Sequence, residues 1–201
     1  MSESSTSLST DPPPESDAQL AARVQAGDAA AFDEVMRRYK RPLVSFAFRM
    51  LGTAHEAEDI AQGVFVRAYF AVRERRFRIG PAKFSTWLFT LTRNACVDAL
   101  RRRGRRAEQS LDHPGPLATD PAVTRATPAT DASSRELGAA IAAAVAELPE
   151  DQKTALILSA YEDLSYAEIA AIMKCSGKSV EARLYRARQF LRQRLAHLLR
   201  Q

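Results

Sequence analysis

Apolar residues recur every three or four positions along two long stretches of this 201-residue chain, and a proline-rich stretch separates the two. Such spacing gives a helix one apolar face, so it predicts helices rather than strands. Glycine is scarce, at 8 residues, and Ala, Leu and Arg dominate, which also favours helices. We therefore predict an all-α protein made of two small helical domains joined by a flexible linker.

The periodicity divides the chain into parts that we expect to behave differently. Residues 1–16 have no apolar period and include three consecutive prolines, which is typical of a disordered leader. Periodicity is lost again across 104–133, where four of the ten prolines lie, so this segment is the predicted linker. The two helical domains then span 17–103 and 134–201. Within them we expect helices at about 17–26, 29–51, 54–73, 84–103, 134–147, 150–163, 166–173 and 177–199.

Positive charge is concentrated in two blocks, although the net charge of the whole chain is only +5. Residues 67–106 contain twelve Lys or Arg against two acids, and residues 174–200 contain eight against one. Two separated basic blocks on an otherwise acidic chain indicate two contacts with one polyanion, because each neutralised phosphate releases counterions. Solvated helix surface is the alternative for either block alone.

The sequence indicates no metal, cofactor or membrane site. Cys96 and Cys175 lie far apart in apolar helical patterns without a neighbouring Cys or His, so we expect core residues rather than metal ligands. The N-terminus lacks the order of charges and apolar residues that marks a signal peptide, and no apolar stretch reaches the ~18 residues of a membrane span. We expect a cytoplasmic protein without membrane insertion.

The second basic block carries a helix-turn-helix pattern. Ser165 and Glu168 have the spacing of a capping box and should start a short helix, and a tight turn is expected at 174–177. The helix after the turn has a basic face opposite its apolar stripe, as a reader of the major groove requires. The alternative is an ordinary pair of helices with a solvated basic face. The residues expected to contact DNA are Lys178, Ser179, Ala182, Arg183, Tyr185, Arg186 and Gln189.

The helix expected at 54–73 has an unusual outer face. Its core stripe leaves Asp59, Gln62, Val66 and Phe70 together on the other side. Val66 and Phe70 would then be exposed to water beside an acid and an amide, so a partner surface is the simplest explanation. The alternative is that neighbouring helices of the same domain cover them.

Aromatic and basic residues lie close together in the segment between residues 84 and 103. An aromatic face beside a cation suits unstacked or flipped bases, because every base has a π-face and each phosphate a charge. We also expect Phe84, Trp87 and Leu88 to form part of the core.

Four stretches together resemble the extracytoplasmic-function sigma factors, a compact group of the sigma-70 family that keeps only regions 2 and 4. Residues 59–65 (DIAQGVF) are similar to region 2.2, and residues 84–94 are similar to regions 2.3 and 2.4. Residues 148–152 (LPEDQ) are similar to the start of region 4.1, and residues 168–188 are similar to region 4.2. The stretches occur in the family's order and cover most of both predicted domains.

The resemblance implies a non-enzymatic alternative sigma factor that binds RNA polymerase core and directs initiation at a specific set of promoters. Its implied partners are the β′ clamp helices, the β flap, promoter DNA and an anti-sigma factor. The implied core-binding residues are Asp59, Gln62, Val66 and Phe70, and the helix that follows Ser176 would read the −35 element. The residues implied for the −10 element are Arg76, Arg78, Lys83, Arg93, Asn94, Arg101 and Arg102.

Two positions depart from the family pattern. Gly63 stands where an acid usually follows Gln62, which removes a charge from the implied docking face. Lys178 follows Gly177 where Thr or Ser is usual, which adds a cation at the start of the recognition helix.

A helix-turn-helix activator that is not a sigma subunit is the main alternative. Its N-terminal half should show strands or a pocket-forming pattern, whereas residues 17–103 have helical periodicity. A nucleic-acid enzyme is the second alternative, but neither half contains a paired-carboxylate, Cys/His or glycine-rich phosphate motif. The three histidines, His55, His113 and His197, are scattered, so we do not expect a catalytic role for them.

Overall fold

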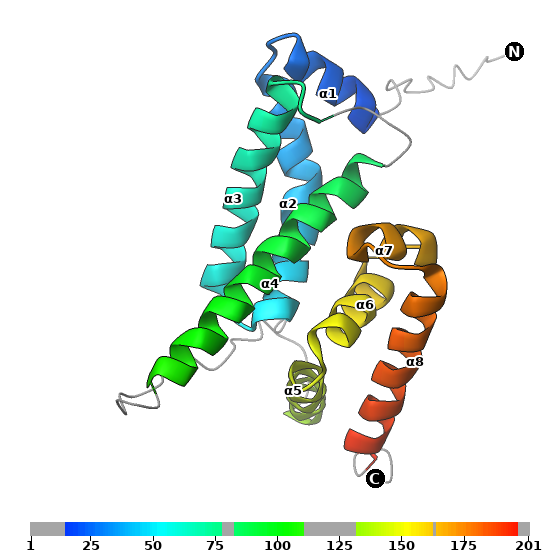
Figure 1. Cartoon of the computed structure of the whole chain (residues 1–201). Helices are drawn as coiled ribbons and strands as arrows, with labels where there is room; N and C mark the ends of the chain where they lie inside the picture. The colour runs from blue at the N-terminus through cyan, green and yellow to red at the C-terminus, as the bar shows by residue number, and fades with distance from the viewer. Residues whose placement is uncertain (1–14, 78–82, 111–131, 163, 197–201) are drawn as a thin grey trace, which may run out of the picture.

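The structure is a computed structural model that describes residues 15–77, 83–110, 132–162 and 164–196. These residues form eight α-helices and no strand (Figure 1), so the predicted all-α class is confirmed. The helices are α1 (Asp17–Gln25), α2 (Ala30–Leu51), α3 (Ala54–Arg73), α4 (Phe84–Ser110), α5 (Ala132–Ala146), α6 (Glu150–Tyr161), α7 (Tyr166–Met173) and α8 (Gly177–Arg194).

Most helix boundaries agree with the prediction, but α4 and α8 do not. α8 ends at Arg194 rather than at 199, and α4 continues to Ser110 rather than ending at 103. Gly104 was the expected break, but Arg and Ala on both sides of it are strong helix formers and carry the helix through. Residues 104–110 are therefore helix and not linker. The predicted leader and linker otherwise fall mainly on 1–14 and 111–131, outside the described residues.

The N-terminal half is a bundle in which α2, α3 and α4 lie side by side and α1 packs across one end (Figure 1). The apolar stripe of α2 supplies its centre, where Leu43, Phe46 and Met50 are fully buried. The ring of Phe46 meets the ring of Phe89 of α4 edge-on, with the ring centroids 5.8 Å apart. α2 ends at Gly52, whose positive φ of 84° is the left-handed conformation that glycine tolerates best.

The C-terminal half packs α6, α7 and α8 around a second group of buried residues, with α5 against α8. Ile157, Ile169, Ile172 and Leu184 have no more than 1% of their surface exposed. The two halves also touch each other, since α6 contacts α2 and α7 contacts α4. The buried apolar residues of both halves form one continuous cluster.

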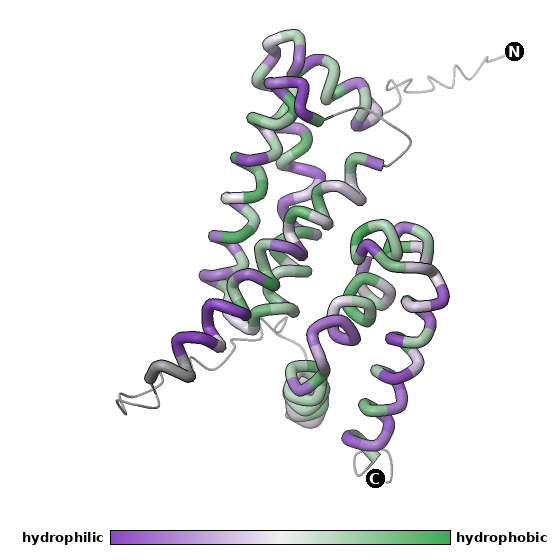
Figure 2. Tube along the Cα trace, in the orientation of Figure 1, coloured by the Kyte–Doolittle hydropathy of each residue, from purple (hydrophilic) through white to green (hydrophobic). Residues whose placement is uncertain are grey.

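The hydropathy of the chain follows this packing (Figure 2). Hydrophobic and hydrophilic positions alternate along the helices, and the hydrophobic ones include the buried core, whereas the far part of α4 is strongly hydrophilic and projects from the bundle. Among the described helices, none combines the length and the apolar character that crossing a bilayer requires.

Candidate functional site

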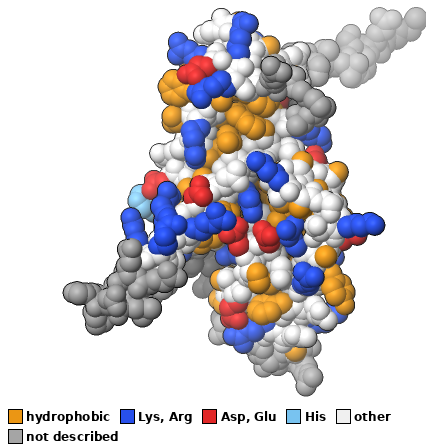
Figure 3. Space-filling model, viewed as in Figure 1, with side chains coloured by type: hydrophobic (Ala, Val, Ile, Leu, Met, Phe, Trp, Pro, Cys, Tyr) orange, Lys and Arg blue, Asp and Glu red, His pale blue; other side chains and the backbone are white. Residues whose placement is uncertain are grey.

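A groove between α2 and α3 has a mostly apolar lining. Val66 and Phe70 border it and are 57% and 45% exposed, so the neighbouring helices of the bundle do not cover them. This confirms the predicted apolar outer face of α3. Figure 3 shows hydrophobic side chains gathered over this bundle. The groove is lined by Met36, Lys40 and Val44 from α2 and by Gln62, Val66 and Phe70 from α3, among others.

Three of the four residues predicted for this face line the groove, and Asp59 does not. Asp59 lies nearly one turn before Gln62 on α3, with its carboxylate 3.6 Å from the imidazole of His55 and largely exposed. Gly63 is not required by packing, because a Cβ at this position would meet nothing within 4 Å. An acid would fit here without a clash, so the packing of α3 does not explain why glycine replaces it.

An aromatic cluster forms where the chain leaves α3 and enters α4. The rings of Phe77 and Trp87 are 4.4 Å apart, and both rings contact Phe84. Phe84 and Leu88 are buried and Trp87 is partly exposed, which confirms their predicted contribution to the core. The cluster places a partly exposed aromatic face beside Lys83.

The basic residues predicted around this cluster have different environments. Asn94, Arg101 and Arg102 are exposed on α4, and Arg76 forms a 2.5 Å ion pair with Glu74. Arg78 lies outside the described residues. The remaining two, Lys83 and Arg93, form ion pairs with acids of the C-terminal half.

The helix-turn-helix forms as predicted. The Ser165 hydroxyl accepts a 3.3 Å hydrogen bond from the Glu168 amide, and the Glu168 carboxylate accepts one of 2.9 Å from the Ser165 amide. Hydrogen bonds from Lys83 and Ser165 lower the pKa of Glu168 to about 2. Lys174 closes α7 in the left-handed conformation, and the Ser176 hydroxyl caps α8 by accepting from the Ser179 amide.

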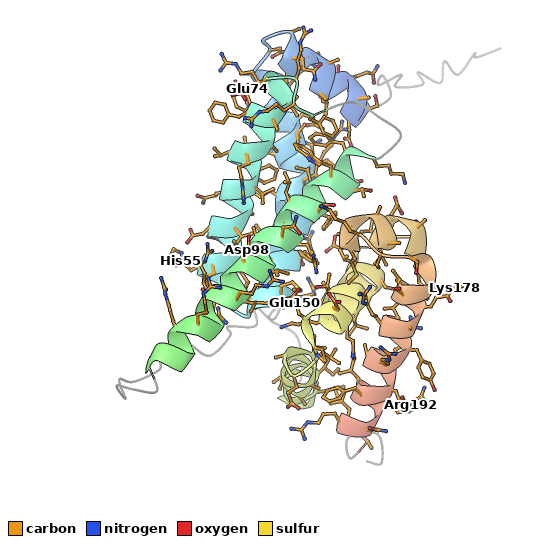
Figure 4. All side chains as sticks on the ribbon, in the orientation of Figure 1. His55, Glu74, Asp98, Glu150, Lys178 and Arg192 are labelled. Carbon is orange, nitrogen blue, oxygen red and sulfur yellow. The ribbon has the colours of Figure 1, made fainter. Side chains whose placement is uncertain are left out.

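The outer face of α8 is a shallow groove, and five of the seven predicted DNA-contacting residues line it. Ser179 and Arg183 lie to one side, where Arg183 forms a 2.9 Å ion pair with Asp151 of α6. Figure 4 shows Lys178 and Arg192 on the side of α8 that faces away from the bundle. The five residues are Lys178, Ala182, Tyr185, Arg186 and Gln189.

Neither cysteine belongs to a metal cluster within the described ranges, where no three His, Cys, Asp or Glu side chains group to hold an ion. Cys96 is buried, and burial raises the pKa of its thiol to about 12. Such a thiol stays protonated and unreactive at neutral pH. Cys175 lies in the turn between α7 and α8 and is partly buried against the core.

Comparisons with known proteins agree with this geometry. The family model described as Sigma-70 region 2 matches residues 35–106, and the model described as Sigma-70, region 4 matches residues 138–191. The RNA polymerase sigma-H factor of Pseudomonas aeruginosa is 36% identical over 93% of this chain and 97% of its own length. The ECF RNA polymerase sigma factor SigW of Bacillus subtilis is 33% identical over 88% of this chain and 95% of its own length. The chain belongs to the extracytoplasmic-function sigma factors of the sigma-70 family.

Two solved structures of other proteins have a fold similar to that of this sigma factor. CnrH, solved in complex with the cytosolic domain of CnrY, is 25% identical, with a TM-score of 0.65 over 91% of this chain and 99% of CnrH. The sigma factor RpoE of Bartonella quintana, solved with the anti-sigma factor NepR, is 27% identical. Its TM-score is 0.61 over 82% of this chain and 96% of RpoE.

The region 2 match of the sigma factor contains the α2–α3 groove and the aromatic cluster, and the region 4 match contains the groove on the outer face of α8. Members of this family are non-catalytic initiation factors that give RNA polymerase its promoter specificity. The protein is thus an alternative sigma factor.

Sequence reasoning missed one wall of the α2–α3 groove. This wall lies on the outer side of α2 and consists of Met36, Lys40 and Val44, which are spaced four residues apart. A Met and a Val on an otherwise polar helix face could have indicated an exposed apolar surface. It also missed a second hollow, which lies between Tyr166 at the start of α7 and the side of α8 that carries Tyr185, Arg188 and Arg192. The spacing of Arg188 and Arg192, four residues apart on α8, could have indicated this side of the helix.

Proposed function

We propose that this sigma factor binds RNA polymerase core through the α2–α3 groove, melts the −10 element at region 2 and reads the −35 element with α8. It carries no catalysis of its own and acts in the cytoplasm at a specific set of promoters. The observation that carries the proposal is the uncovered apolar groove of region 2, found in one chain with a basic recognition helix.

The groove fits the β′ clamp helices of the polymerase. A docked helix would cover Val66 and Phe70, which region 2 itself leaves exposed. Gln62 within the groove and Asp59 beyond it would supply polar contacts at the edge, as in most protein interfaces. This arrangement favours binding driven by a few apolar anchors with a polar rim.

The surface around the start of α4 fits the melted −10 element. Trp87 offers a partly exposed ring on which an unpaired base could stack, and Asn94 offers an amide for a base edge. Arg101 and Arg102, farther along the exposed side of α4, would hold phosphates. Arg76, Arg78, Lys83 and Arg93 complete the proposed −10 surface.

The outer groove of α8 fits the major groove of the −35 element. Arg186 and Gln189 are exposed there and can pair bidentately with guanine and adenine, respectively. Lys178 at the start of the helix would contact phosphate, and region 4 would rest on the β flap. Ser179 and Arg183, on the flank of α8, remain proposed −35 contacts.

We further propose that regions 2 and 4 correspond to domains at 17–103 and 134–201, and that an anti-sigma factor controls their availability. Two similar proteins support control by such a partner. RpoE was solved in complex with the anti-sigma factor NepR, and CnrH was solved in complex with the cytosolic domain of CnrY. The α2–α3 groove is one surface that such a regulator could cover.

The direct test is assembly with polymerase core that lacks any sigma subunit. The full chain should co-elute with core in gel filtration, initiate run-off transcription from its promoters and be displaced by excess housekeeping sigma factor. A helix-turn-helix activator would bind DNA without core and without this competition. Retained DNA binding with no co-elution would therefore reject the proposal in favour of that alternative.

A further inference from the structure

Glu181 is the single acid of the second basic block, where eight Lys and Arg residues lie between positions 174 and 200. It is exposed on α8, one residue beyond the first turn of the helix. Its side chain lines the outer groove of α8 together with Lys178, three residues before it, and Tyr185, four residues after it. Lys178 marks this end of α8 in Figure 4, on the side that faces away from the bundle. An acid therefore lies on the face that we propose reads the major groove.

The packing of α8 does not account for this carboxylate. The arginines of α8 that pair with acids find those acids on other elements: Arg183 lies 2.9 Å from Asp151, and Arg194 lies 2.9 Å from Glu147. No Lys or Arg in the described part of the chain forms an ion pair with Glu181. The cap of α8 also forms without it, from serines at the start of the helix. Glu181 is thus free to contact a ligand.

A carboxylate on a DNA-binding face needs a hydrogen-bond donor in the complex. The phosphates that line the groove repel it, and a carboxylate that loses its water without gaining a partner costs free energy. An ionised carboxylate only accepts hydrogen bonds. In the major groove, the only donors on the bases are the amino groups of cytosine and adenine. DNA can therefore satisfy Glu181 only at one of these two bases.

Cytosine fits a carboxylate better than adenine does. The major-groove edge of cytosine presents its 4-amino group alone, whereas adenine presents the acceptor N7 beside its amino group. Two acceptors that face each other repel, so N7 disfavours a carboxylate at adenine. Guanine and thymine present acceptors and no donor in this groove. The chemistry of Glu181 therefore favours a cytosine.

The neighbours of Glu181 allow it to approach a base edge. Ala182, which lines the same groove, carries only a methyl group, so the backbone of α8 can lie close to the bases. Glu181 is in the N-terminal half of the helix, the part that reads base edges in a helix-turn-helix. Arg186 lies five residues farther along, about 7.5 Å at ~1.5 Å per residue, so the two side chains should contact different base pairs.

We infer that Glu181 is a specificity-determining residue of α8, whose carboxylate accepts a hydrogen bond from the 4-amino group of a cytosine in the −35 element. This inference rests on the proposed function for the position of α8 in the major groove. Because the carboxylate is repelled by phosphate wherever no amino group faces it, Glu181 favours cytosine at one position and also disfavours the other bases there.

Selection of promoter DNA by holoenzyme tests the inference with the full chain. Core polymerase assembled with each variant selects from duplexes of random sequence that are long enough to hold both promoter elements. Sequencing of the bound duplexes gives the base preference at each position. The variants are Glu181→Ala and Glu181→Gln. The matched control Glu147→Gln removes the same charge from region 4 at the pair with Arg194, outside the α8 groove.

We expect native holoenzyme to prefer cytosine at one position of the −35 element by at least about five-fold over each other base. Glu181→Ala should lower this preference below about two-fold and leave the other positions unchanged, because only one acceptor is lost. Glu181→Gln should change the preferred base there to adenine, since an amide pairs with both N6 and N7 of adenine. The control should select the native sequence. Helix content by circular dichroism should be equal for all, because position 181 is exposed.

The nucleoside of 2-pyrimidinone, a cytosine analogue without the 4-amino group, gives a second measurement at the same position of the selected promoter. It should weaken binding by native holoenzyme at least about five-fold and binding by Glu181→Ala less than about two-fold. Equal losses would overturn the inference. So would a native −35 element without a preferred cytosine, or Glu181 variants that keep the cytosine preference and bind all sequences more tightly. Failure of native holoenzyme to select any common sequence would instead overturn the proposed function.

Discussion

The amine of Lys153 donates a 2.9 Å hydrogen bond to the carbonyl of Met50, one residue before the end of α2, across 103 positions of sequence. The last carbonyls of a helix have no partner within the helix and carry partial negative charge, so a cation there is favourable. Arg103 donates to the next carbonyl, that of Leu51. Region 4 thereby completes the cap of a region 2 helix. Burial and the nearby charge of Arg103 lower the pKa of Lys153, so keeping this side chain charged at the site costs free energy.

Replacing Lys153 with Ala should destabilise the protein. The change removes the bond to a buried carbonyl and the apolar stem of the side chain, so the free energy of unfolding should fall by about 1–3 kcal/mol. Urea unfolding followed by circular dichroism measures this. The control Lys178→Ala, at an exposed position of α8, should stay within ~0.5 kcal/mol of the native protein. Equal midpoints for the two variants would show that Lys153 is not buried against α2 in solution.

The double variant Val66→Ser, Phe70→Ala should weaken assembly with polymerase core at least ten-fold, equivalent to ~1.4 kcal/mol. Both side chains are exposed in free protein, so the free energy of unfolding should change little. Fluorescence titration of labelled sigma factor with core gives the affinity. Tyr185→Ala, which removes an even more exposed aromatic ring from α8, is the control and should bind core normally. If a folded double variant bound core with native affinity, the groove would not be part of the interface.

Arg186 and Lys178 should respond differently to truncation, although they line the same groove. Arg186→Ala should cost on the order of 1–3 kcal/mol on the cognate promoter and relax preference at one base position, because a base contact is lost. Lys178→Ala should weaken all sequences alike and lower the salt slope by about one, because a phosphate contact is lost. Competition binding of holoenzyme to promoter libraries at several salt concentrations separates the two. If Arg186→Ala weakened binding to all sequences equally, α8 would contact phosphates without reading bases.

Glu162 should give the protein a distinct pH dependence. Burial at the end of α6 raises the pKa of this carboxyl to about 7, although the charge of Arg49 acts in the opposite direction. The folded state therefore binds this proton more tightly than the unfolded state, and the stabilisation is lost as pH rises from about 4.5 to 7. Relative to the native protein, Glu162→Gln should thus be more stable at pH 8 than at pH 5.

Urea unfolding of native protein and Glu162→Gln at the two pH values measures that difference. Glu181→Gln, at an exposed position of α8, is the control and should show no such gain between pH 5 and 8. If the free energy of unfolding changed equally with pH in native protein and in Glu162→Gln, the carboxyl of Glu162 would be exposed to solvent in the folded protein.

Local patterns in the sequence were sufficient to predict the helices and the faces of α3 and α8. The capping box at Ser165, the exposed Val66 and Phe70, and the buried stripe of α8 depend on neighbours within a few positions. The end of α4 was predicted wrongly because Gly104 was weighted above the helix propensity of the arginines around it.

The ion pairs of Lys83 and Arg93 with acids of the C-terminal half could not be predicted in the same way. Arg93 meets acids 57 and 58 positions away, and nothing in the local pattern of α4 or α6 specifies that pairing. The basic blocks indicated surfaces for DNA, but charge counting cannot show which cations already have an acid beside them. That information depends on how two separately patterned domains pack.

The carboxylate of Asp151 is shared by two arginines that come from different halves of the protein. Arg93 reaches Asp151 from another domain, whereas Arg183 reaches it from α8, within the same helical unit as α6. Each oxygen of the carboxylate serves a different half, so the two arginines do not compete for one acceptor. A change at Asp151 would therefore alter the surroundings of α4 and of α8 together, and this single acid couples the positions of two helices that the sequence patterns separately.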